Sequence, residues 1–143
     1  MRLFTDLHIH SRYSRATSLR MDLMEISRFA KIKGLNLVGS GDFTHPKWYN
    51  QLNNVLIPDS ETNLFQIAAD PSNNVRFMLT TEVCTIFDFE NSIKKIHHVI
   101  FAPNLEIVKQ INETLKNYGK IDSDGRPILK MTAPELVEKI MGI

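Results

Sequence analysis

The sequence has little that would carry the chain out of the cell or into a membrane. A single cysteine, Cys84, excludes an internal disulfide bond. The start, "MRLFTDLHIH", lacks the apolar core of about 7–15 residues that a secretory signal needs, and no run approaches the roughly 18 apolar residues of a membrane span. The net charge of +1 excludes a chain-wide field that would draw the protein to nucleic acid or acidic lipid. We therefore expect a cytoplasmic protein without membrane association, in which any affinity for nucleic acid is local.

What the sequence does have is a regular alternation of strand and helix patterns. Its 143 residues and hydrophobic content of 43% suit one domain with its own core. Apolar, near-alternating stretches predict strands over residues 2–10, 35–42, 75–83 and 95–103, with the polar "FENS" as a turn between the last two. Helical spacing with capping residues predicts helices over residues 21–34, 104–119 and 132–142. This order indicates an α/β protein with a parallel sheet or barrel, and an incomplete one, because an eight-unit barrel needs about 250 residues.

Two histidines, His8 and His10, flank one isoleucine at the end of the first expected strand. Residues two apart in a strand point to the same side, so we expect the two rings to project together. An H-x-H pair on a strand is as often two surface histidines as a pair of metal ligands. Its position favours the second interpretation, because parallel sheets build their sites at the carboxyl ends of strands.

Further histidines and carboxylates stand at or near the ends of the other expected strands. Asp42 and His45 follow the second strand in "GSGDFTH", although Asp42 alone equally fits an Asx turn or a helix cap. Glu82 ends the third strand, where a buried carboxylate needs a positive partner such as a metal. His97 and His98 lie in the fourth strand and face opposite ways, so at most one of them points into the same site.

Imidazole and carboxylate together suit zinc, iron or manganese, and a cluster of this size suits two ions and hydrolytic chemistry on a phosphate. Arg12 and Arg15 follow the first histidine pair, and Lys94 and Lys95 precede the second. Such basic groups favour a phosphate ligand, although a solvated surface is their commoner role. The single tryptophan, Trp48, suits base stacking or plain core.

Four motifs in this order, "DLHIHSRYS", "GDFTH", "TTEV" and "KIHHVIFAP", resemble the PHP phosphoesterases, the family of histidinol phosphatase and of the PHP domains of bacterial replicative DNA polymerases. More closely, "DLHIHSRYSRATS", "GDFTHPKW", "LTTEV", "KIHHV" and "DGRPIL" are similar to the amino-terminal part of the endonuclease Q family. The likeness covers nearly the whole chain.

The resemblance implies a distorted seven-stranded PHP-type β/α barrel with metals at the carboxyl ends of its strands, of which residues 1–143 would form about half. No histidine follows His98, so the later ligands of the family, a further histidine and a closing Asp-x-His pair, have no counterpart. We therefore expect a truncated amino-terminal segment of a PHP domain. Its expected protein partner is a second chain that completes the barrel, or another copy of itself.

The resemblance also implies roles for individual residues. The implied metal ligands are His8, His10, Asp42, His45, Glu82 and one of two adjacent histidines, with His98 preferred because an apolar stretch follows it and His97 as the alternative. The expected ions are divalent, with zinc first and manganese, iron or magnesium after it. The implied catalytic residues are Asp42, Glu82 and Arg15, the last standing near the place of another histidine in histidinol-phosphatase-like members. The implied phosphate or DNA contacts are Arg12, Arg15, Lys47 and Trp48.

The implied function is that of a metal-dependent DNA-repair endonuclease. Such an enzyme nicks DNA on the 5′ side of abasic sites and of deaminated bases, namely uracil, hypoxanthine and xanthine, so damaged DNA is the implied substrate. One alternative is a small-molecule phosphomonoesterase of the histidinol-phosphatase type. Another is a catalytically inactive PHP module that binds metal or docks a partner, and the missing later ligands leave open whether this chain alone is an enzyme.

Overall fold

Strand β5 (Arg76–Phe89) organises the computed structural model, which describes residues 2–143 and leaves Met1 outside the described part. Threonine, valine, isoleucine and phenylalanine, which favour extended backbone, make up much of this long strand. Its first half pairs parallel with β2 (Leu37–Gly39) and antiparallel with β4 (Phe65–Ile67). Its second half pairs antiparallel with β6 (Ser92–Ala102) and parallel with β7 (Ile128–Lys130).

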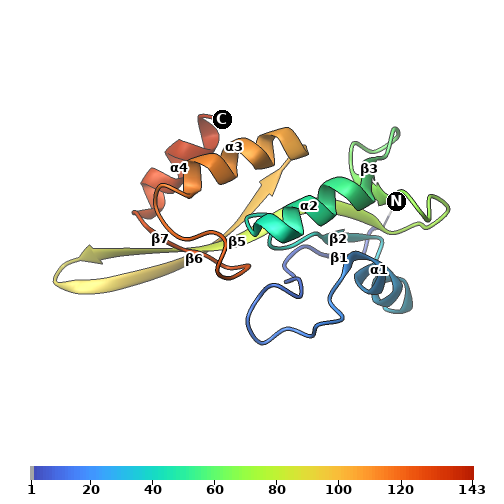
Figure 1. Cartoon of the computed structure of the whole chain (residues 1–143), viewed down its shortest axis with the longest axis horizontal. Coiled ribbons are helices and arrows are strands. Elements are labelled where there is room, and N and C mark those ends of the chain that lie inside the picture. Colours follow the sequence, from blue (N-terminus) through green and yellow to red (C-terminus); the bar gives the residue numbers. More distant parts are fainter. Residues whose placement is uncertain (1) are drawn as a thin grey trace.

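Two short strands complete a seven-stranded sheet that is mixed and not closed. β1 (Thr5–Asp6) lies parallel to β2, and β3 (Leu56–Pro58) lies antiparallel to β4. The expected parallel pairing is confirmed for β1–β2, β2–β5 and β5–β7, whereas β3–β4, β4–β5 and β5–β6 are antiparallel. For β5 and β6 the reason is a tight turn in which Glu90 and Asn91 both adopt positive φ, at 49° and 59°. Such a turn folds two strands into an antiparallel hairpin, which extends beyond the helices (Figure 1).

Three of the four helices agree with the sequence prediction because their caps are local. Helix α1 (Leu23–Ile32) begins at Asp22, and α3 (Leu105–Leu115) begins at Asn104, whose side chain accepts a hydrogen bond from the Ile107 N–H. Helix α4 (Ala133–Met141) carries the complete Thr132–Glu135 capping box. None of the helices within residues 2–143 has the length and apolar character needed to cross a membrane.

Helix α2 (Pro46–Val55) was not predicted from the sequence, because its polar, asparagine-rich segment buries only Trp48 and Leu52. Helices α2, α3 and α4 lie on one side of the sheet, whereas α1 lies on the other side, near β1 (Figure 1). Trp48 is fully buried, and its Nε1–H donates to the Gly41 carbonyl at 2.8 Å. This tryptophan is therefore a core residue, and the predicted DNA contact at Trp48 is not available in this fold.

We predict that Leu79→Ala lowers the free energy of unfolding by about 2–5 kcal/mol, because Leu79 on β5 is fully buried and its loss leaves a cavity. Leu19→Ala is the matched control, since Leu19 is 80% exposed and loses the same atoms. Urea unfolding followed by circular dichroism measures both variants. Similar destabilisation of the two would contradict the placement of Leu79 in the core.

Candidate metal centre

The candidate site lies where one edge of β5 changes its partner. β2 pairs with β5 as far as Met78, and β7 joins the strand at Cys84. Both partners use the same edge, because the N–H groups of Arg76 and Cys84 donate to carbonyls of the β2 and β7 segments at 2.8 and 2.9 Å. Between Met78 and Cys84 this edge of β5 pairs with no strand among residues 2–143. Glu82 and the residues that follow β1 and β2 lie beside it.

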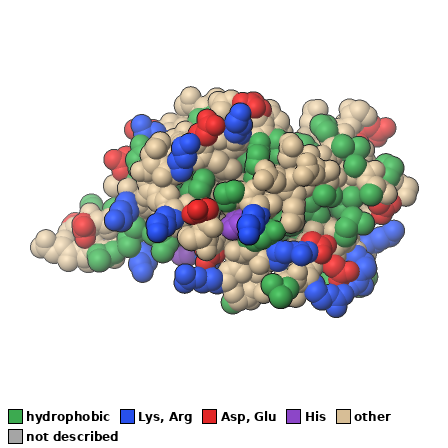
Figure 2. Space-filling model, in the orientation of Figure 1, with side chains coloured by type: hydrophobic (Ala, Val, Ile, Leu, Met, Phe, Trp, Pro, Cys, Tyr) green, Lys and Arg blue, Asp and Glu red, His purple; other side chains and the backbone are tan. Residues whose placement is uncertain are grey.

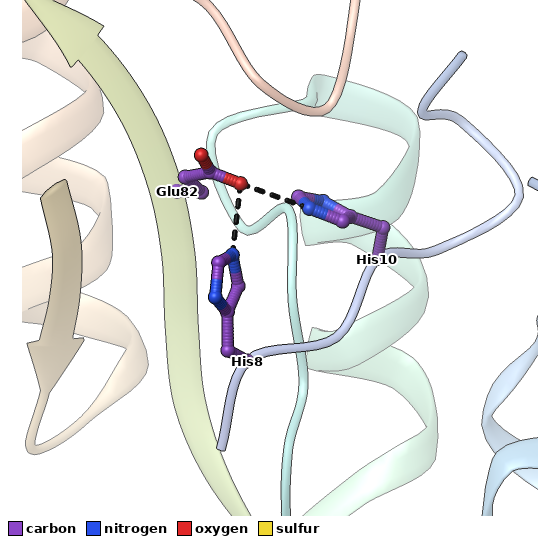
Figure 3. A group of neighbouring side chains, drawn as sticks. All are labelled: His8, His10 and Glu82. Carbon is purple, nitrogen blue, oxygen red and sulfur yellow. Dashed lines mark hydrogen bonds and ion pairs between the residues drawn. The ribbon is translucent and has the colours of Figure 1, made fainter. Parts of the chain in front are cut away.

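Glu82, His8 and His10 converge at this point (Figure 3). The Nε2 atoms of His8 and His10 lie 2.8 and 2.9 Å from the same Glu82 oxygen, and ligand atoms of all three residues lie within 4.8 Å of one another. The Glu82 side chain is 4% exposed, while His8 stays open to solvent. Two imidazoles and one carboxylate are a donor set that fits zinc, manganese or iron. The predicted convergence of the H-x-H pair and Glu82 is therefore present.

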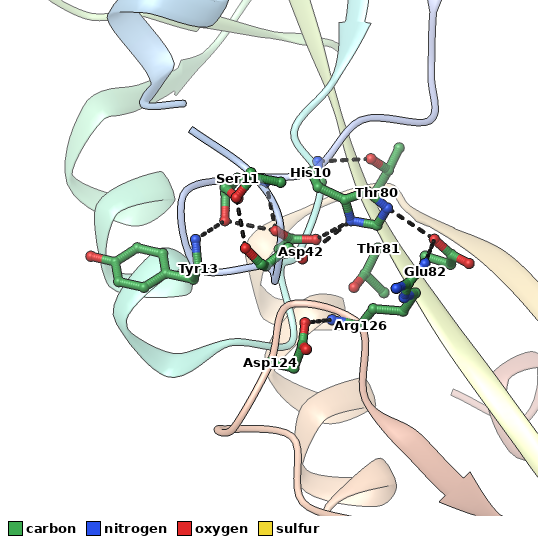
Figure 4. A network of polar contacts seen from close by, with 12 residues as sticks. His10, Ser11, Tyr13, Asp42, Thr80, Thr81, Glu82, Asp124 and Arg126 are labelled. Carbon is green, nitrogen blue, oxygen red and sulfur yellow. Dashed lines mark hydrogen bonds and ion pairs between the residues drawn. The ribbon is translucent and has the colours of Figure 1, made fainter. Parts of the chain in front are cut away.

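Asp42 stands behind His10 and outside this group of converging atoms (Figure 4). The Nδ1–H of His10 donates to one Asp42 oxygen at 2.8 Å, and the other oxygen accepts from the Ser11 N–H and hydroxyl at 2.6 and 2.7 Å. Asp42 is fully buried and has a φ of 49°, a left-handed conformation that aspartate tolerates. A carboxylate on Nδ1 fixes the ring so that Nε2 faces a metal, as outer partners do in many metal sites.

Neighbouring groups shift the pKa values of His10 and Glu82. Hydrogen bonding to Asp42 raises the pKa of His10, against the opposing effect of burial. Burial raises the pKa of Glu82, but hydrogen bonds from His8 and His97 outweigh it, so the net pKa lies below the ordinary value. The two ring nitrogens of His10 thus each face a carboxylate, Nδ1 towards Asp42 and Nε2 towards Glu82.

The two adjacent histidines of β6 point to opposite faces of the sheet. His97 is paired with Cys84, and its Nδ1–H donates to Glu82. His98 instead lies beside Thr85, with 3.0 Å between its Nε2 and the threonine hydroxyl, and burial lowers its pKa. The preference for His98 based on the apolar residues after it is not supported by the geometry. The strand register brings the alternative, His97, to the site.

His45 lies apart from the three converging residues. It precedes the first turn of α2, and its ring stacks on Tyr13 with centroids 4.5 Å apart. Its Nδ1 is buried without a hydrogen-bond partner among residues 2–143. Burial lowers the pKa of His45. A role for His45 as a metal ligand stays a prediction.

Of the predicted phosphate contacts, the arginines are paired with aspartates. Arg12 contacts Asp22, and the Arg15 Nε lies 3.1 Å from Asp124. Lys47 is exposed at the start of α2.

Arg126, which sequence analysis missed, lies closest to the cluster, with a terminal nitrogen 3.9 Å from Glu82 (Figure 4). Its only sequence signal is its place in "DGRPIL", a motif of the resemblance that carried no assigned role. The loop that carries Arg126 packs tightly on the site. The Gly125 N–H donates to the Tyr13 carbonyl at 3.2 Å, and a Cβ at Gly125 would overlap the Asp42 carboxylate and the Ser14 hydroxyl. This close approach requires glycine and holds Arg126 beside Glu82.

Comparison with known proteins gives two solved neighbours and one curated relative. No family model matches the chain. An uncharacterized protein of Methanocaldococcus jannaschii is 34% identical over 139 residues, which is 96% of this chain and 15% of that protein. The crystal structure of the lesion-specific endonuclease PfuEndoQ from Pyrococcus furiosus matches with a TM-score of 0.79 and 38% identity. Endonuclease Q in complex with a 27-mer duplex substrate, with an abasic lesion at the active site, matches equally well.

The chain is similar to part of endonuclease Q. Each match covers 96% of this chain and 32% of the solved endonuclease Q chain, so the chain spans about a third of those proteins. Both the identity of 38% and the TM-score of 0.79 indicate that the shared part has the same fold. The predicted likeness to this DNA-repair endonuclease is confirmed at that level.

We predict that His97→Gln weakens zinc binding by about tenfold or more, the range seen on removing even an outer partner of a metal site. His98→Gln is the matched control from the neighbouring position, and it should leave the affinity unchanged because His98 faces Thr85. Competition with a chromophoric zinc chelator measures both. A loss of zinc affinity confined to His98→Gln would show that His98, and not His97, belongs to the metal centre.

Gly125→Ala should displace the loop, because its new methyl group meets the carboxylate and the hydroxyl described above. We expect a loss of about 1–3 kcal/mol in the free energy of unfolding, which is typical of overpacking. Gly142→Ala is the control, since a Cβ there approaches only backbone of α4, at 3.2 Å or more. Equal thermal stability of the two variants would show that the loop does not depend on this contact.

Proposed function

We propose that this chain is part of a metal-dependent endonuclease of the endonuclease Q type, which hydrolyses the DNA backbone beside abasic sites and deaminated bases. The observation that carries the proposal is the convergence of His8, His10 and Glu82 in a fold that matches endonuclease Q at 38% identity. The match to a neighbour solved with an abasic duplex supports damaged DNA as the substrate.

We also propose that the open sheet belongs to a PHP-type β/α barrel that is completed outside residues 1–143. The carboxyl ends of β1 and β2 and the middle of β5 meet at the metal centre, which is where barrels of parallel strands place their sites. The outer edges of β1 and β3 pair with no strand among residues 2–143, so further strands from the rest of a longer chain, or from a second chain, have edges to join.

In this proposal, His8, His10 and Glu82 are the residues that would hold a divalent metal, with zinc expected first. Such a metal would polarise a phosphoryl oxygen and lower the pKa of a water molecule. Asp42 keeps the proton of His10 on Nδ1 and so orients the ring. Arg126 donates charge-assisted hydrogen bonds to the phosphate from its place beside Glu82.

The proposal predicts metal-dependent nicking of damaged duplex DNA by this chain in its completed barrel, whether the further strands come from a longer chain or from a second one. With zinc or manganese present, we expect nicks 5′ of an abasic site, uracil or hypoxanthine and none in undamaged DNA. A chelator should abolish nicking, and Glu82→Gln should reduce it by at least about a hundredfold, since a buried ligand is lost. Glu113→Gln is the matched control because Glu113 is exposed on α3.

Two other outcomes would point elsewhere. Turnover of nitrophenyl phosphate without nicking of any duplex would favour a small-molecule phosphomonoesterase. Tight metal binding that is lost in Glu82→Gln, with no hydrolysis of either substrate, would favour an inactive metal-binding module.

A further inference from the structure

A cavity of about 650 Å³ adjoins the metal centre and has a strongly uneven charge. Most of its lining residues come from the segment that leads from α3 into β7. Arg15, from the segment between β1 and α1, also lines it. Its charged lining residues are Arg15, Lys116, Lys120, Arg126, Lys130 and Asp124, so five are basic and one is acidic. The whole chain carries a formal charge of only +1, so the positive charge is concentrated here.

Most of this positive charge is not neutralised by the protein. Arg15 lies 3.1 Å from Asp124, and Arg126 lies 3.9 Å from Glu82. The three lysines are exposed and form no ion pair with any carboxylate of residues 2–143. Lys and Arg side chains gather around the histidine and carboxylate groups on this face (Figure 2). Like charges held together without acidic partners attract an anion from solution.

Arg126 connects the cavity to the metal centre, because it lines the cavity and lies 3.9 Å from Glu82. Backbone hydrogen bonds fix the segment on both sides of this residue. The Cys84 N–H donates to the Pro127 carbonyl at 2.9 Å, and the Lys130 N–H donates to the Tyr118 carbonyl, also at 2.9 Å. Together with the tight packing of Gly125, these bonds place the basic groups at a set position relative to Glu82.

We propose that this basic cavity binds the sugar-phosphate backbone of DNA next to the phosphate that is cut. The identity of the strand as DNA rests on the function proposed above. A small phosphate ester is usually enclosed by a few convergent polar groups, whereas flexible lysines on an open rim suit a polymer with a charge on every unit. Contacts to phosphate and sugar carry no sequence information, so backbone binding here is independent of base sequence and of the lesion.

The test replaces the three unpaired lysines together, as Lys116→Gln, Lys120→Gln and Lys130→Gln. The control removes the same charge from exposed lysines at the end of α1 and in α3, as Lys31→Gln, Lys33→Gln and Lys109→Gln. Fluorescence anisotropy with chelator present measures binding of an abasic duplex and an undamaged duplex over a range of chloride concentrations. Circular dichroism melting shows that both variants are folded.

We expect the cavity variant to bind both duplexes at least tenfold more weakly than the control variant. Its plot of log affinity against log salt should become shallower by about 2.7, since each lysine that neutralises a phosphate contributes roughly 0.9. Equal weakening by the two triple variants would overturn the proposal, because net charge alone would explain it. Weakening confined to the abasic duplex would overturn it as well. So would displacement of DNA by inorganic phosphate beyond the effect of chloride at matched ionic strength, which would assign the cavity to a free phosphate ester.

This test is separate from the test of the proposed function. If the chain never nicks DNA but the cavity variant loses backbone binding as described, the endonuclease proposal fails and the backbone surface stands. If nicking occurs and the cavity variant binds as well as the control, the surface fails and the endonuclease proposal stands.

Discussion

The buried carboxylate of Glu82 is the constraint on which the arrangement of the site depends. An ionised carboxylate with so little exposure is costly unless positive groups surround it. The chain supplies them from distant segments: His8 and His10 after β1, His97 on β6, and Arg126 before β7. His8, His10 and Arg126 reach Glu82 because β5 exchanges β2 for β7 at this point, which leaves one stretch of this edge free for side chains, whereas the register of the β5–β6 pairing brings His97 to it. The positions of the metal centre and of the basic cavity therefore both depend on this gap in the pairing of β5.

Features that depend on local sequence were predictable. The caps of α1, α3 and α4 involve residues three apart, and the side chains of Asp22, Asn104 and Thr132 each accept the expected hydrogen bond. The turn between β5 and β6 was also recognisable from its polar residues. In contrast, β7 and the place of Arg126 depend on a loop that returns to β5 from far along the chain, and no local pattern encodes that return. Helix α2 escaped prediction because packing of Trp48 and Leu52, rather than helix propensity, stabilises it.

Predicting the residue types of the site proved easier than predicting their directions. His97 and His98 differ by one position, and one position in a strand reverses the face, so only the register with β5 decides between them. From the sequence, Asp42 suited either a residue of a turn or a metal ligand. The structure gives it a left-handed backbone and aims its carboxylate at His10, an orienting role that lies between the two. Ser11, which completes the contacts of Asp42, lies within the "DLHIHSRYS" motif, but the sequence assigned it no role.

The length of the β5–β6 hairpin bears on how the metal centre is assembled. Eleven residue pairs keep its register from Leu79 to the turn, so Glu82 and the projecting tip belong to one continuously paired hairpin. His8 and His10 are attached to a different strand. The metal centre is therefore assembled across two parts of the fold: the carboxylate belongs to the hairpin, whose tip exposes Phe89 and Ile93, and the two imidazoles belong to the segment that follows β1.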